Sequence, residues 1–79
     1  MSHYLIEAIW DPEATVWVAT SEDVPGLATE SASLEALAHK LRTLVPELLE
    51  ANDVLPRDDS TEISFEIVGH REELIRLAS

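Results

Sequence analysis

"SLEALAHKLRTLVPELLEAN", residues 33–52, is the stretch of sequence that decides the fold. Its apolar residues recur at the spacing of one helix face, namely Leu34, Leu37, Ala38, Leu41, Leu44, Val45, Leu48 and Leu49. Ser33 is a favourable N-cap, because its hydroxyl can accept a hydrogen bond from an N–H of the first turn. Pro46 is expected to bend the helix without ending it, because the apolar phase continues beyond it. Asn52, in a left-handed conformation, is expected to close the helix.

Strand-like segments flank this helix. Residues 3–10 and 15–20 are rich in aromatic and β-branched residues, and the short connection between them favours an antiparallel hairpin. Val24-Pro25-Gly26-Leu27 predicts a type II turn, since proline presets φ at the second position and glycine allows a positive φ at the third. A short third strand is expected at residues 27–30. Residues 62–68, "EISFEIV", alternate between apolar and polar side chains and predict a last strand.

The order of these elements predicts an α+β fold of the type β-β-β-α-β. We expect a four-stranded mixed sheet with one long kinked helix on one face, in which the last strand runs parallel beside the first. Residues 1–79 form one domain with its core in 3–68, and residues 69–79 form a tail or a short helix. A chain of this size gains little stability from its own core, so we expect a homodimer through the open sheet face or an edge strand.

Composition restricts the possible partners. Sixteen acidic against five basic residues give a formal charge of −11. Such a chain lacks the Lys and Arg that direct binding to nucleic acid requires. The charge either keeps the domain soluble or steers a basic partner protein towards it. The sequence has no cysteine, no export signal and no apolar stretch long enough to cross a membrane, so we expect a cytoplasmic protein.

No catalytic or cofactor-binding constellation is apparent. The three histidines, His3, His39 and His70, have no spacing that suggests shared metal binding, and we interpret them as surface residues. Glu7 and Glu66 become neighbours if the first and last strands pair in parallel, but two-metal hydrolysis needs a third carboxylate. Asp58 and Asp59 lie in a predicted loop, away from that pair. We therefore expect a protein that is not an enzyme and has no cofactor.

The segment "VWVATSEDVPGLATESASLEALAHKLRTLVPELLEAN" resembles the HicB-like antitoxin domain. Asp23-Val24-Pro25-Gly26 and Ser33-Leu34-Glu35 carry most of this resemblance. It implies a partial ribonuclease-H-like fold and a non-enzymatic role, in which the domain binds and neutralises a small basic RNA-cleaving toxin. Such antitoxins usually carry a C-terminal DNA-binding segment, for which this chain has no room, so we do not expect it to repress its own operon.

The acidic turn and its surroundings are the predicted partner-binding surface. The residues assigned to this surface are Trp17, Glu22, Asp23, Pro25, Gly26 and Leu27. The third strand is short and leaves unpaired backbone groups at the edge of the sheet. Trp17 either belongs to the core or anchors an interface, where tryptophan is favoured. The alternative function is a small-ligand sensor or a residual metal-dependent nuclease on the same scaffold.

Overall fold

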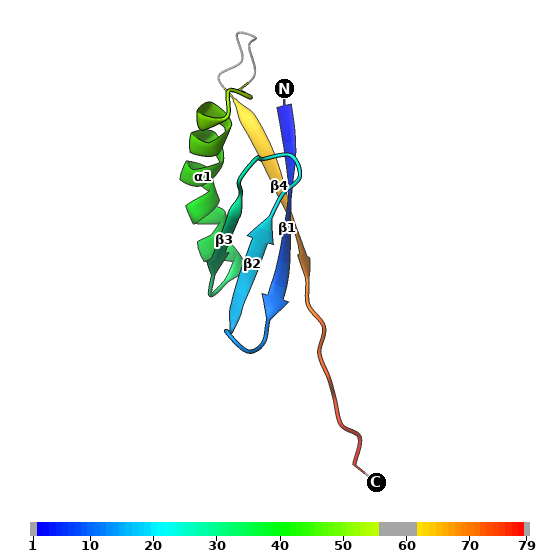
Figure 1. The fold of residues 1–79 in the computed structure, drawn as a ribbon. Helices are drawn as coiled ribbons and strands as arrows, with labels where there is room; N and C mark the ends of the chain where they lie inside the picture. Colours follow the sequence, from blue (N-terminus) through cyan, green and yellow to red (C-terminus); the bar gives the residue numbers. More distant parts are fainter. Residues whose placement is uncertain (1, 56–61, 79) are drawn as a thin grey trace.

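A computed structural model describes residues 2–55 and 62–78, and they form a four-stranded sheet with one helix on one face (Figure 1). The elements are β1 (Ser2–Asp11), β2 (Val16–Thr20), β3 (Ala28–Ser31), α1 (Leu34–Ala51) and β4 (Ile63–His70). The strand order in the sheet is β3-β2-β1-β4. β2 is antiparallel to both β1 and β3, and β4 is parallel to β1. The predicted α+β fold with the order β-β-β-α-β is confirmed.

The core lies between α1 and the sheet. Its members are 9% exposed or less, namely Ile6, Ala8, Trp17, Ala19, Val24, Leu27, Leu37, Leu41, Val45 and Leu49. Ala8 and Ala19 face each other across β1 and β2 and are fully buried. Because alanine has only a methyl side chain, this pair forms a flat part of the sheet surface on which the leucines of α1 pack.

The two ends of α1 confirm one prediction and correct another. Ser33 is the N-cap, and its Oγ accepts a hydrogen bond from the Ala36 N–H at 3.1 Å. Asn52 is the C-cap but has φ −102°, so its predicted left-handed conformation is wrong. Asp53 adopts that conformation instead, with φ +53°. The Asp53 N–H donates to the Glu50 carbonyl and the Val54 N–H to the Leu49 carbonyl, which is the Schellman closure of a helix.

The remaining differences concern element lengths. α1 continues through Pro46, as the unbroken apolar phase predicts, while the predicted bend at this residue stays a prediction. β4 extends to His70, two residues beyond the predicted end. Residues 71–78 have neither helix nor strand and run away from the body of the domain (Figure 1). Asp58 and Asp59 lie outside the described residues.

Alternation along the strands leaves the second sheet face without a covering layer in the described part of the chain. We call this surface the open face. It carries the side chains that alternate with the core positions, namely His3, Leu5, Glu7, Ile9, Asp11, Val16, Val18, Thr20, Ala28, Glu30, Ser64, Glu66, Val68 and His70. Leu5 is 39% and Ile9 56% exposed, so large apolar side chains on either side of Glu7 are accessible to solvent on this face.

Replacing Leu41 by alanine should lower the free energy of unfolding by about 3 kcal/mol, since a fully buried leucine leaves a cavity between α1 and the sheet. Urea denaturation measures this loss. Leu44→Ala, at a half-buried position of the same helix, is the matched control and should cost clearly less. Equal losses for the two variants would contradict the assigned core.

Thr15 occupies a conformation that suits glycine better than a β-branched residue. It ends the connection between β1 and β2 with φ +54°. Thr15→Gly should therefore raise the free energy of unfolding by about 0.5 to 1 kcal/mol, measured by urea denaturation. Ala14→Gly, at the preceding residue, should lower it; a loss of stability in both variants would refute the strain at Thr15.

Candidate partner-binding surfaces

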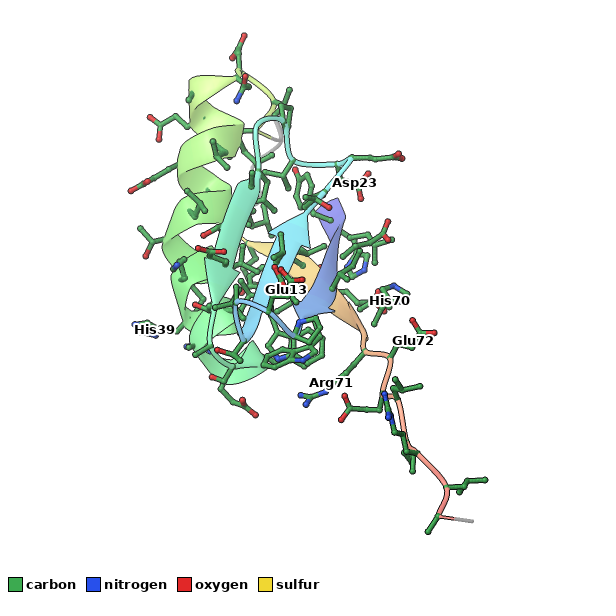
Figure 2. The ribbon with its side chains drawn as sticks, turned by 60° about the horizontal axis from the view of Figure 1, so that its bottom comes forward. Glu13, Asp23, His39, His70, Arg71 and Glu72 are labelled. Atoms are coloured by element: carbon green, nitrogen blue, oxygen red, sulfur yellow. The ribbon has the colours of Figure 1, made fainter. Side chains whose placement is uncertain are left out.

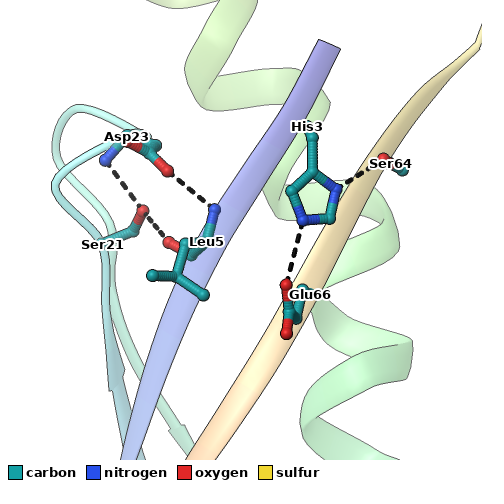
Figure 3. A network of polar contacts seen from close by, with 6 residues as sticks. All are labelled: His3, Leu5, Ser21, Asp23, Ser64 and Glu66. Atoms are coloured by element: carbon teal, nitrogen blue, oxygen red, sulfur yellow. Dashed lines mark hydrogen bonds and ion pairs between the residues drawn. The ribbon is translucent and has the colours of Figure 1, made fainter. Parts of the chain in front are cut away.

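The acidic turn, residues 21–27, is fixed to β1 by side chains that hydrogen-bond the β1 backbone beyond the end of β2. Thr20, the last residue of β2, lies opposite Glu7. Further along β1, the Leu5 N–H donates to Asp23 Oδ2 at 2.8 Å, and Ser21 Oγ donates to the Leu5 carbonyl at 2.6 Å (Figure 3). Ser21 Oγ also accepts from the Asp23 N–H at 3.0 Å. The side chains of Asp23 and Ser21 thus make the hydrogen bonds to the Leu5 backbone that a neighbouring strand would otherwise make.

A type II turn forms the tip of this segment. The Leu27 N–H donates to the Val24 carbonyl at 3.2 Å, and Gly26 has φ +78°, both as predicted from Pro25-Gly26. Asn52 Nδ2 donates to the Pro25 carbonyl at 3.4 Å and joins the turn to the end of α1. The turn is therefore held from β1 and from α1 while its outer side stays exposed.

The predicted partner-binding residues do not share one surface. Glu22, Asp23, Pro25 and Gly26 lie exposed in the turn, whereas Leu27 is 5% exposed and belongs to the core. Trp17 is 9% exposed and lies near the other end of β2, where its ring centroid is 5.4 Å from that of Trp10. Glu22 and Pro25 remain accessible to a partner, and Trp17 and Leu27 support the sheet from within.

The edge strand β3 is partly protected. Lys40 Nζ on α1 donates to the Glu30 carbonyl at 2.5 Å, so a basic side chain occupies one backbone acceptor of this four-residue strand. Charged side chains of this kind guard sheet edges against unwanted pairing. The sequence did not indicate this contact, because Lys40 and Glu30 have no periodic relation to each other.

Two carboxylate–histidine pairs lie on the strands β1 and β4. His3 Nε2 is 3.0 Å from Glu66 Oε1, and His3 Nδ1 is 2.9 Å from Ser64 Oγ (Figure 3). His70 Nε2 is 3.9 Å from Glu7 Oε2. All three histidines are exposed, as interpreted. The pairing of His3 and His70 with acids follows from the parallel register of β1 and β4, which the sequence did not indicate residue by residue. Residues 2–55 and 62–78 contain no group of three or more His, Cys, Asp or Glu that could hold a metal ion.

The tail begins at a stacked contact with β1. The guanidinium carbon of Arg71 lies 4.3 Å from the centre of the Trp10 ring, and Arg71 Nε is 3.5 Å from Glu73 Oε2. Figure 2 shows Arg71 and Glu72 at the start of the tail. An open hollow here is lined by Ile9 and Pro12 together with residues 69–74. No helix in the described residues is both long enough and apolar enough to cross a membrane.

Asp23→Ala should lower the free energy of unfolding by about 1 kcal/mol, because the Leu5 N–H loses a charged acceptor. It should also speed hydrogen exchange at the Leu5 amide, which is measured by NMR. Glu22→Ala, the neighbouring exposed acid, is the control and should change neither quantity. Unchanged exchange at Leu5 in Asp23→Ala would contradict the role given to this carboxylate.

Comparison with known proteins places this arrangement in a family. The chain is similar to the crystal structure of hypothetical protein TTHA1013 from the extremely thermophilic bacterium Thermus thermophilus, with 45% identity and a TM-score of 0.78. The match covers 92% of this chain and 99% of that one. No curated protein matches the chain. The family described as "Domain of unknown function (DUF1902)" matches residues 3–78, and the chain belongs to this family.

Proposed function

We propose that this domain is a non-catalytic interaction module that binds and neutralises a small basic protein, in the manner of a HicB-type antitoxin and its RNA-cleaving toxin. The observation that carries the proposal is the acidic turn, which is exposed to solvent and yet fixed in place by hydrogen bonds to β1 and α1. A surface held in this way loses little conformational entropy when a partner binds. We also propose that the fold is a partial version of the ribonuclease-H-like fold.

Charge supports a basic partner. The chain carries a formal charge of −11, and Glu22 and Asp23 add two carboxylates next to each other at the turn. In the part of the chain that the structure describes, neither of these two acids has an ion pair. Their negative field therefore faces solvent, where it can raise the rate of association with a positively charged surface.

The buried residues of the predicted surface have an indirect role in this proposal. Leu27 is the last residue of the turn and packs into the core, so it fixes the position at which Pro25 and Gly26 are presented. Trp17 anchors the opposite end of β2. We further propose that binding takes place in the cytoplasm, where an RNA-cleaving toxin finds its substrate.

Recovery of the tagged domain from its own host should yield a small basic protein, and the purified complex should suppress RNA cleavage by that protein. Glu22→Lys should then lower the association rate about 3- to 10-fold at low salt and much less at high salt, because steering acts through unscreened charge. Stopped-flow or surface plasmon resonance measurements at two ionic strengths provide this readout.

Glu13→Lys is the matched control, since it makes the same change of charge at an exposed residue of the connection between β1 and β2, at the opposite end of the sheet from the turn. If the two variants slow association equally, the turn has no special role and only the net charge matters. If no protein partner is recovered, or if the complex leaves RNA cleavage unchanged, the antitoxin-like function is wrong.

A further inference from the structure

The tail carries the most exposed apolar side chains of the described residues. We call residues 71–78 the arm. Leu74 is 90%, Ile75 78% and Leu77 89% exposed, and none of the three packs against the core of its own chain. Three large aliphatic side chains on one short segment are an unfavourable surface in water unless another surface covers them. The family match includes this segment, so the arm is part of the domain.

The root of the arm directs it away from its own sheet. Arg71 stacks on Trp10, which fixes the chain immediately after the last paired residue of β4, His70. From there the arm continues outwards beyond the hairpin end, and the molecule has a long axis of 62 Å against 20 and 19 Å for the others (Figure 1). Covering the open face of the same chain would require a reversal directly after the stacked arginine.

The open face offers the complementary surface. Ile9 faces Val18 across β1 and β2, while Val68 lies beside Glu7 across β1 and β4, so three strands contribute apolar side chains to this face. An eight-residue arm in extended conformation reaches about 26 Å. Four strands span about 14 Å. The arm is therefore long enough to cross a whole sheet of a second molecule.

Charges fit the same arrangement. Glu7, Glu30 and Glu66 lie on the open face, and no Lys or Arg of the described strands does. The arm has two arginines and two glutamates, so it is neutral in a chain of formal charge −11. Arg76 lies between Ile75 and Leu77, where it can meet a carboxylate of the open face while its neighbours contact apolar residues.

We propose that the arm of one molecule lies across the open face of a second copy of this chain, and that the exchange is reciprocal. The resulting interface is isologous, so it closes as a dimer with twofold symmetry and leaves no free arm to recruit further copies. The acidic turn lies at the end of the sheet opposite the root of the arm, so this dimer is independent of the proposed toxin binding (Figure 1).

Removing the arm tests the proposal without disturbing the core. Sedimentation equilibrium at about 20 µM should give a mass about twice 8.8 kDa for the full chain. A chain ending after Arg71 should be a monomer with unchanged circular dichroism, and so should the triple variant Leu74→Ser, Ile75→Ser, Leu77→Ser. A monomeric full chain, or a dimer that persists without the arm, overturns the proposal.

Cross-linking tests where the arm lies, and the absence of native cysteines makes this experiment clean. Val18→Cys and Ile75→Cys are made in separate chains that carry tags of different mass, mixed, and treated with a short bis-maleimide. A cross-linked product containing both tags supports the exchange. Glu47→Cys replaces Val18→Cys in the control and should give no such product, because Glu47 lies on the outer side of α1.

Two other outcomes overturn the proposal. A double variant with Val18→Cys and Ile75→Cys that cross-links within a single chain shows that the arm folds back onto its own sheet. Equal cross-linking of Ile75→Cys to the open-face position and to the control position shows that the arm samples solvent without a binding site.

Discussion

The rest of the structure depends on the packing of α1 against the sheet surface that contains Ala8 and Ala19. Leu37, Leu41 and Val45 are fully buried there. The backbone of α1 comes closest to β3 and β2, and the small alanines of β1 and β2 leave room for its buried side chains. This contact covers one sheet face, so binding must use the open face, the turn, the edges, the arm or the outer side of α1.

The fold could be predicted from the sequence to a large extent, and for a physical reason. The helix and the last strand have clear periodicity, and Pro25-Gly26 permits few backbone conformations. The end of the helix was harder to predict, because Asn52 and Asp53 both tolerate positive φ and only the hydrogen bonds to Glu50 and Leu49 distinguish them. The tail could not be assigned, since Leu74, Ile75 and Leu77 have helical spacing but no surface to pack on.

The candidate surfaces were less predictable than the fold. An exposed acidic turn could be inferred from Glu22-Asp23 and Pro25, but the bond from the Leu5 N–H to Asp23 depends on where β2 stops. Similarly, the pairing of His3 with Glu66 needs the register between strands that are about sixty residues apart in sequence. Such contacts arise from tertiary placement, which local patterns do not encode.

The position of β4 has a consequence for synthesis of the protein. β1 is translated first of the five elements and β4 last, yet the two are neighbours in the sheet, with Ser2 in register with Ile63. Until the ribosome has released β4, one long side of β1 has no hydrogen-bonding partner from its own chain. Nascent chains are therefore exposed to wrong pairing through most of translation, and the density of acidic residues helps to keep them apart.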